Sequence, residues 1–234
     1  MKQFLKLPDR LAAIAGYIDE GSAVADIGTD HGFLPVYLAQ NGLSRNIIAS
    51  DISSSSLGSA RRTAQKYGVA HMISFIAAPG LSCVGEKGAD TIIIAGVGGE
   101  TIAGILADAP WTNKHNVKLI LQPQTKTAGL CAWLRENGYV ISDAKLTRDN
   151  GRFYVIIVAG GGISESVLEP ELEMLTRLMY KKDPLFTGYL DELINKTSRI
   201  LEGAKDSVSA DHLNTALKLS VYLSLKEVNK NWRE

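Results

Sequence analysis

Short apolar runs alternate with amphipathic stretches over the first 137 residues of the chain. An apolar run of roughly four to eight residues predicts a buried strand, whereas apolar residues spaced three and four apart predict a helix. Continuous apolar runs are typical of parallel strands, which are covered on both faces. The alternation therefore predicts a parallel sheet between layers of helices. The expected strands are 23–27, 46–51, 72–77, 89–95 and 117–122, and the expected helices are 7–18, 34–41, 53–67, 100–109 and 126–137.

A different pattern follows, in which two further strands flank a short turn. Residues 139–147 and 153–159 are the expected strands, and Asp149-Asn150-Gly151 lies between them. A short turn containing Asn-Gly favours a hairpin, so these strands are expected to be antiparallel. A parallel sheet closed by one reversed strand differs from the ordinary dinucleotide-binding sheet and is the arrangement expected of class I methyltransferases. We therefore predict a Rossmann-like α/β fold with a seven-stranded sheet and a reversed final strand.

The last part of the chain has a wholly helical pattern. It follows Gly160-Gly161-Gly162, a predicted linker, and its expected helices are 168–180, 185–201 and 211–231. The last two helices would form a short antiparallel, coiled-coil-like arm. We therefore expect a Rossmann-like domain of residues 1–162 and a helical domain of residues 163–234. The arm would either cover the sheet or grip a large substrate.

The composition is that of a soluble globular protein, with 45% hydrophobic and 21% charged residues. No apolar run approaches the roughly 20 residues of a membrane span, and no signal peptide is visible. Cys83 and Cys131 lie far apart without motif spacing, which suits a reducing cytoplasm and argues against a disulfide framework or a zinc site. We expect a cytoplasmic protein that binds no metal and no membrane. The oligomeric state stays open, and a monomer is compatible with the pattern.

The charges are balanced, with 25 basic and 25 acidic residues. Nucleic-acid-binding proteins usually show a basic face, which the net charge does not indicate here. Arg61, Arg62 and Lys66 lie near one another on one expected helix and form either a local basic patch or a solvated face. Charge alone favours the solvated face.

The stretch Val24–Gly32 combines a buried strand with a turn that contains Gly28 and Gly32. Strand, glycine turn and following helix form the nucleotide-binding corner of a doubly wound sheet. Asp26 ends the strand and Asp30 lies inside the turn, where carboxylates would repel the phosphates of a dinucleotide. The turn therefore favours a phosphate-free cation such as S-adenosylmethionine over NAD. The glycine spacing by itself leaves an NAD-dependent oxidoreductase as an alternative.

Asp51 ends the second expected strand. A carboxylate at this strand tip can accept hydrogen bonds from both ribose hydroxyls, in NAD sites and in S-adenosylmethionine sites alike. The alternative is an aspartate that caps the next helix.

Four stretches carry a family resemblance: Leu7-Pro8-Asp9-Arg10-Leu11, Ala25-Asp26-Ile27-Gly28-Thr29-Asp30-His31-Gly32-Phe33-Leu34-Pro35, Ala95-Gly96-Val97-Gly98-Gly99 and Leu121-Gln122-Pro123. Together they resemble the TrmK family of bacterial tRNA (adenine-N1)-methyltransferases, which act on adenine 22 of tRNA. The resemblance covers essentially the whole chain, including the helical arm. It implies an enzyme that transfers a methyl group from S-adenosylmethionine to N1 of that adenine, with the arm in contact with tRNA.

The chemistry of methyl transfer suggests three catalytic candidates. The methylated adenine is positively charged, and Asp30 would stabilise this charge, with His31 and Gln122 positioning the base. Each has a structural alternative: Asp30 would bind only the donor's ammonium, His31 would make a structural hydrogen bond, and Gln122 would cap a strand. By the resemblance, the donor would be held at its methionine part by Asp26, Gly28, Asp30, His31 and Gly32, at its ribose and adenine by Asp51 and Ile52, and at its methyl-transfer face by Ala95, Gly96 and Val97. Gln122 and Pro123 would lie near the target base, and Thr29, Gly80 and Leu81 are further expected donor-binding residues.

One position departs from the family pattern. The family usually has Gly-Asp-Gly-Leu after the third strand, with the aspartate reaching the donor's adenine amino group, and this chain has Ala78-Pro79-Gly80-Leu81. Proline offers neither a carboxylate nor an N–H group. The missing hydrogen bond is expected to cost on the order of 1 kcal/mol, or several-fold in donor affinity. A donor-impaired, non-catalytic tRNA-binding protein is therefore the second hypothesis.

Overall fold

The structure is a computed structural model that describes residues 4–85, 88–114, 116–203 and 209–233. The chain divides into two compact units, Met1–Arg177 and Leu178–Glu234.

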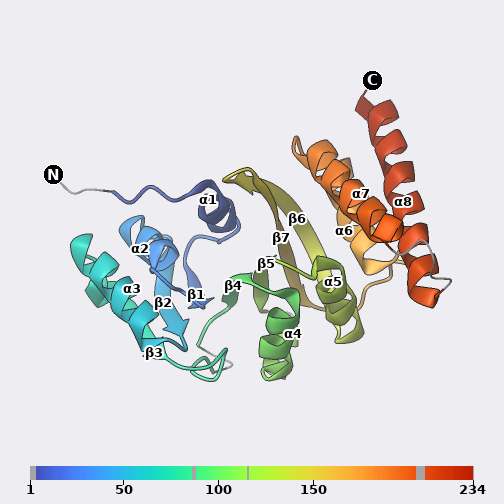
Figure 1. The fold of residues 1–234 in the computed structure, drawn as a ribbon. Helices are drawn as coiled ribbons and strands as arrows, with labels where there is room; N and C mark the ends of the chain where they lie inside the picture. Colours follow the sequence, from blue (N-terminus) through green and yellow to red (C-terminus); the bar gives the residue numbers. More distant parts are fainter. Residues whose placement is uncertain (1–3, 86–87, 115, 204–208, 234) are drawn as a thin grey trace. The chain divides into compact units, whose positions relative to one another are not determined.

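The first unit is built on a seven-stranded sheet in the order β3-β2-β1-β4-β5-β7-β6. The first five strands in the sequence are parallel to one another, and β7 is antiparallel to both β5 and β6 (Figure 1). The expected hairpin and reversed final strand are therefore confirmed. The strands are β1 (Ser22–Ile27), β2 (Ser44–Asp51), β3 (Ile73–Ala77), β4 (Thr91–Val97), β5 (Lys118–Pro123), β6 (Tyr139–Asp149) and β7 (Arg152–Gly161).

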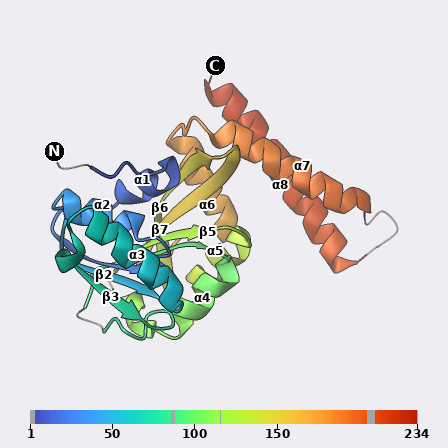
Figure 2. The ribbon, with the colours of Figure 1, turned by 60° about the vertical axis from the view of Figure 1, so that its left-hand side comes forward.

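Helices cover both faces of this sheet. Helices α1, α2 and α3 lie on one face, and α4, α5 and the start of α6 lie on the other (Figures 1 and 2). Short 3₁₀ turns, η1 (Ala70–Met72) and η2 (Pro110–Asn113), precede β3 and β5. The helices are α1 (Asp9–Ala15), α2 (Phe33–Gln40), α3 (Ser54–Lys66), α4 (Gly99–Ala107), α5 (Thr127–Glu136) and α6 (Pro170–Tyr180).

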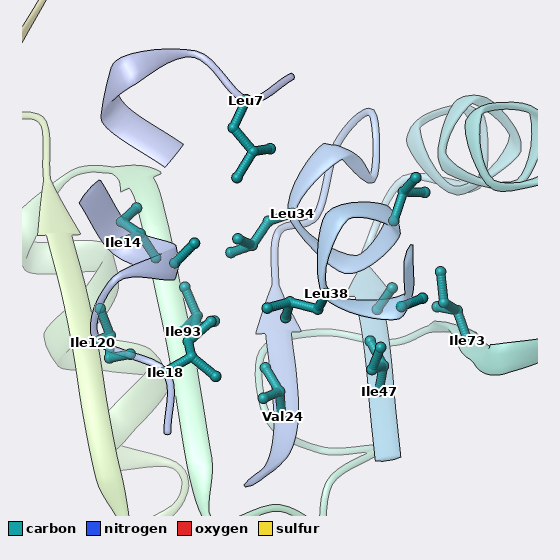
Figure 3. Close-up of a cluster of buried hydrophobic side chains, with 14 of the residues drawn as sticks. Leu7, Ile14, Ile18, Val24, Leu34, Leu38, Ile47, Ile73, Ile93 and Ile120 are labelled. Carbon is teal, nitrogen blue, oxygen red and sulfur yellow. The ribbon is translucent and has the colours of Figure 1, made fainter. Parts of the chain in front are cut away.

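One part of the hydrophobic core lies between α1, α2 and the sheet (Figure 3). Every residue of β1 is buried, and Ile14, Val24 and Ile93 have no exposed surface. Burying one such side chain contributes about 1.5–3 kcal/mol. This packing holds the carboxyl ends of β1 and β4 in fixed positions, and the turns that follow these strands start from there.

The glycine run at residues 160–162 is not the expected linker. Gly160 pairs with Lys118 and Gly161 pairs with Tyr139, so β7 continues through Gly161. A Cβ atom on Gly161 would lie only 1.7 Å from the carbonyl oxygen of Asn113. The glycine therefore serves a close approach between β7 and η2 and does not act as a hinge.

The boundary between the compact units also lies later than the expected one at residue 162. Helix α6 begins within the first unit, where Glu173 accepts hydrogen bonds from Arg135 (2.7 Å) and Arg177 (2.9 Å). The sulfur atoms of Cys131 and Met174 lie 4.0 Å apart. These contacts tie the first turns of α6 to α5, which the helical pattern of the sequence could not reveal.

The second unit contains the long helices α7 (Phe186–Gly203) and α8 (Ala210–Arg233). They run antiparallel beside each other (Figures 1 and 2). The Nζ atom of Lys226 lies 2.7 Å from Oδ1 of Asp191, and Asn229 donates a hydrogen bond to Thr187. The expected pair of long antiparallel helices is confirmed. Among the described residues, none of the helices combines the length and the apolar character that a membrane span requires.

Candidate functional site

A cavity of about 730 Å³ lies at the carboxyl ends of β1, β2 and β4. The sheet order reverses here, because β2 and β4 lie on opposite sides of β1. Ligands of open α/β sheets bind in the crevice at this reversal. The walls come from the turn after β1, the tip of β2, the loop after β3, the end of β4, α1 and the β6–β7 hairpin. The fold thus brings together segments that are far apart in the sequence.

The turn after β1 is fastened to β2 by backbone hydrogen bonds. The amides of Gly28 and Thr29 both donate to the carbonyl of Ser50, at 2.8 and 3.0 Å. Gly28 has a φ of 76°, a conformation that glycine adopts without strain. The turn therefore exposes its own side chains and backbone to the cavity in a fixed conformation.

Gly32 was expected to contact a ligand, but it packs against α3 instead. It has a φ of 69°, and a Cβ atom there would lie 2.8 Å from Cβ of Ala60. Gly32 is buried and does not line the cavity. It permits close packing of the turn on α3, so its effect on the site is indirect.

Asp26 presents a buried carboxylate to the cavity. Its exposed fraction is 6%. Burial raises the pKa of this carboxyl to about 6, with a further increase from Asp51 and opposing effects of Thr29 and Arg10. A cationic ligand group would relieve the desolvation of the charged form. The cavity wall therefore favours a positively charged ligand at the end of β1.

Asp30 and His31 project from the same turn and are largely exposed. Asp30 has a φ of 50°, a region in which aspartate is tolerated better than most residues. Its Oδ2 atom lies 3.6 Å from Nε2 of His31, and the His31 ring stacks on Phe33. Both Asp30 and His31 line the cavity. An exposed pair of this kind contributes little stability and leaves both side chains able to contact a ligand.

Asp51 occupies the tip of β2, as expected. Its Oδ1 atom accepts a hydrogen bond from the amide of Ser53 at 2.8 Å, and Oδ2 accepts one from the amide of Asp30 at 3.2 Å. These bonds set the orientation of the carboxylate and link β2 to the turn after β1. Each oxygen keeps a second lone pair for a ligand hydroxyl. Ile52 is 78% exposed and lines the cavity beside it.

The end of β4 supplies an open wall. Ala95, Gly96 and Val97 all line the cavity, and the pairing with β5 is irregular between Ala95 and Val97. Gly96 has a φ of 83°, and a Cβ atom there would lie 3.8 Å from Nη1 of Arg10 and Nε2 of Gln124. The positive φ therefore favours glycine at this position, and the backbone of residue 96 lies close to the side chains of Arg10 and Gln124.

Besides Gly32, two further expected site residues lie outside the cavity. Leu81 is 4% exposed and packs in the core, while its neighbours Pro79 and Gly80 line the cavity. Gln122 has no exposed surface, so it does not contact a ligand directly. Its side chain accepts a hydrogen bond from Nη1 of Arg10 at 2.9 Å. Sequence position placed both residues near the site but could not show which way their side chains point.

Among the lining residues that sequence reasoning missed are two with a charged side chain, Arg10 and Asp149, and one with an amide side chain, Gln124. Arg10 belongs to a stretch that resembles the family but had no role attached to it. Gln124 follows Gln122 by two positions and is exposed. Asp149 lies at the end of β6, and only the tertiary structure brings the hairpin to the cavity.

The polar side chains that line the cavity fit S-adenosylmethionine. Asp26, Asp30 and Asp51 present three carboxylates near the ends of β1 and β2, a poor environment for a pyrophosphate and a good one for an ammonium, a sulfonium and a ribose. No group of three or more His, Cys, Asp or Glu side chains in the described part of the chain could hold a metal ion. The geometry therefore matches a phosphate-free adenosyl cation.

Comparisons with known proteins point the same way. Residues 7–157 match the methyltransferase domain family. A tRNA (adenine(22)-N(1))-methyltransferase of Bacillus subtilis is 36% identical over 158 residues, which cover 68% of this chain and 66% of that protein, just under two thirds of its length.

Several solved structures resemble nearly the whole chain, and two of them are named TrmK. The crystal structure of the B. subtilis m1A22 tRNA methyltransferase TrmK has a TM-score of 0.81 at 28% identity and covers 95% of this chain and 99% of that chain. The structure of M. capricolum TrmK in complex with S-adenosyl-homocysteine has a TM-score of 0.78 at 27% identity and covers 95% of this chain and 98% of that chain.

Proposed function

Because this chain belongs to the TrmK family of tRNA methyltransferases, we propose that it transfers a methyl group from S-adenosylmethionine to N1 of adenine 22 in tRNA. The observation that carries this proposal is the cavity at the strand ends, with three carboxylates around a glycine turn. The same carboxylates argue against NAD, whose pyrophosphate they would repel. Its tRNA substrate and its two free cysteines fit a cytoplasmic location.

Donor binding follows from the turn and the strand tips. When bound, S-adenosylmethionine supplies a methyl group activated by its sulfonium. Asp26 and the turn at Gly28–Asp30 would hold the methionine part, and Asp51 would accept hydrogen bonds from the ribose. Ile52 and Pro79, both exposed beside the cavity, would contact the adenine. The chain therefore binds and orients the donor through its own fixed groups.

The acceptor adenine would enter along the open wall at Gly96 and Val97. Adenine N1 carries a lone pair and needs no base to attack, but it is normally engaged in pairing, so the adenine must be unpaired or flipped out. Catalysis then depends mainly on proximity and alignment. Asp30 would stabilise the positive charge that develops on the product, and His31 would orient the base beside it.

Asp30→Asn tests the role of this carboxylate. Asparagine keeps the size of the side chain and tolerates the positive φ of residue 30, so the fold should be unchanged. We expect transfer of labelled methyl from S-adenosylmethionine to unmodified tRNA to fall by about a hundredfold or more. Asp19→Asn, which removes an exposed carboxylate outside the cavity, is the matched control. Wild-type turnover by Asp30→Asn would exclude the role.

Mapping of the product distinguishes the leading proposal from the second hypothesis. Methylation at N1 blocks base pairing, so primer extension on treated tRNA should stop at adenine 22. Pro79 is the feature that favours a donor-impaired tRNA-binding protein, because the side chain at this cavity position offers no hydrogen bond. Binding of tRNA without any methyl transfer, at saturating donor, would establish that alternative.

The helical arm, predicted at residues 163–234 and formed in the structure by α7 and α8, is proposed to contact tRNA. Lys196 and Arg199 are exposed on α7 and line a shallow depression of that helix. Reversing both charges to Glu in the full-length chain should weaken tRNA binding by about tenfold or more and reduce its salt dependence. Glu192→Lys on the same helix is the control and should not weaken binding. Unchanged tRNA affinity of the Lys196/Arg199 double variant would leave the arm without this role.

A further inference from the structure

Arg10 is a charged side chain of the cavity that the proposed function leaves without a task. It lies on α1 and lines the cavity together with Asp26 and Gly96. The side chain is half-buried. This arginine lines the same cavity as three carboxylates and interacts electrostatically with Asp26, so its presence there requires an explanation.

The buried side-chain amide of Gln122 holds Arg10 in place. Nη1 of Arg10 donates a hydrogen bond of 2.9 Å to Oε1 of Gln122, which has no exposed surface. The amide nitrogen of Gln122 donates to the carbonyl of Pro123 at 3.0 Å, so the amide oxygen is directed at the guanidinium. The guanidinium carbon also lies 5.8 Å from the ring centre of Tyr154. The orientation of Arg10 is therefore set by β5 and β7.

The guanidinium keeps free donors on its cavity side. Arginine carries five N–H donors in a planar fork, and Gln122 accepts from one of its nitrogens. Nη1 lies 3.8 Å from the position of a Cβ atom on Gly96, and the positive charge lowers the pKa of Asp26. The fork is thus close to both the end of β1 and the end of β4. An anionic ligand group at this place would find a preformed partner.

The donor has one anionic group, the α-carboxylate of its methionine part, and we propose that Arg10 binds this carboxylate, with Gln122 as the residue that positions Arg10. An amino acid is a zwitterion, and the carboxylates of the turn can satisfy only its ammonium. Arg10 supplies the opposite charge on the same side of the cavity as Asp26. This assignment rests on the proposed function and adds the group that recognises the amino-acid end of the donor.

Two ligands that differ only in the α-carboxylate test whether Arg10 binds this group. S-adenosylhomocysteine carries the carboxylate, and 5′-deoxy-5′-(3-aminopropylthio)adenosine is the same molecule without it, with the ammonium retained. Isothermal titration of the full-length protein would compare both ligands on wild type, Arg10→Met and Arg10→Lys. Arg61→Met is the matched control, because Arg61 also lies over an aromatic ring and donates to a backbone carbonyl, but outside the cavity.

Arg10→Met is expected to weaken S-adenosylhomocysteine binding by about ten- to a hundredfold and to change binding of the decarboxylated ligand by no more than about twofold. Arg10→Lys, which keeps the charge without the fork, should fall between wild type and Arg10→Met. An equal loss for both ligands would show that Arg10 only maintains the fold of the cavity. Unchanged binding of both ligands, with weaker tRNA binding, would assign Arg10 to a phosphate and overturn the proposal.

Gln122→Met tests the positioning role, because it removes the amide and keeps the length of the side chain. The KM for S-adenosylmethionine should rise several-fold with little change in kcat, and the selectivity for the carboxylate should fall in parallel. A variant that keeps full selectivity would exclude that role. If wild type distinguishes the two ligands through Arg10 but transfers no methyl group to tRNA, the proposed function fails while the carboxylate site stands.

Discussion

Asp26→Asn should make the ligand-free protein more stable while it impairs donor binding. The carboxyl of Asp26 has an exposed fraction of 6%, and burial raises its pKa from 3.8 to about 6. Because the folded state holds this proton more tightly than the unfolded state does, stability falls as the pH rises through this interval. Ionisation of the buried carboxyl lowers the free energy of unfolding. This loss is absent well below pH 3.8 and fully present above about pH 6. Asparagine cannot ionise, so the variant does not lose this stability.

The size of the effect follows from the two pKa values. Their difference lowers the free energy of unfolding by about 3 kcal/mol at pH 8 and by about 1.5 kcal/mol at pH 5, where most of the folded protein has Asp26 protonated. Urea denaturation of wild type and Asp26→Asn between pH 5 and pH 8 would measure this difference. Asp108→Asn, at the exposed end of α4, is the control and should show a difference within about 0.5 kcal/mol at every pH.

Donor binding should change in the opposite direction. Wild type should bind S-adenosylhomocysteine about tenfold more weakly at pH 5 than at pH 7, because the ammonium requires the ionised carboxylate and most Asp26 is protonated at pH 5. Asp26→Asn should bind weakly with little dependence on pH. An Asp26→Asn protein that is less stable than wild type at pH 8, or that binds the ligand normally, would refute the argument that this buried charge is kept for the donor.

Other positions give independent tests. Pro79→Asp should tighten S-adenosylhomocysteine binding by about several-fold in calorimetry, because it restores a carboxylate at the cavity, and no gain would mean that the adenine does not reach residue 79. Gly161→Ala should lower the melting temperature, because its Cβ atom would lie 1.7 Å from a carbonyl oxygen, whereas Gly104→Ala, with open space around it, should leave it unchanged or raise it. Cys83 should react with a thiol reagent at pH 8 in the folded protein and Cys131 should not, because Cys131 is buried with its pKa raised to about 12, and two rapidly modified thiols would contradict this.

The layout of the sheet could be predicted because it rests on short-range patterns. Continuous apolar runs such as Thr91–Ala95 distinguish parallel strands, and Asn150-Gly151 marks the hairpin that reverses the last strand. The turn after β1 was equally visible, because glycine and aspartate at these positions are dictated by local backbone conformation and by the charge of the ligand. These properties depend only on neighbouring residues, which the sequence lists in order.

Other features depend on atoms that are distant in the chain. Gly160 and Gly161 suggested a flexible linker, yet both pair with neighbouring strands as part of β7. The carbonyl of Asn113, which is distant in the chain, leaves no room for a side chain at residue 161. Helix α6 was expected in the arm, but the pairing of Glu173 with Arg135 ties its first turns to the sheet unit. A pattern of apolar spacing shows that a face will be buried and does not show what will bury it.

In the site, too, some residues were predictable from the sequence and others were placed only by the tertiary structure. Asp26, Asp30 and Asp51 were predictable, since each stands beside a strand end that the sequence marks. The different parts of Gln122 and Arg10 were decided only by the tertiary structure, which buries the Gln122 amide within β5 and brings Arg10 from α1 into hydrogen-bond contact with it. Local sequence determines backbone conformation and charge, whereas side-chain direction and mutual distance are set by packing between segments that the chain brings together only when it folds.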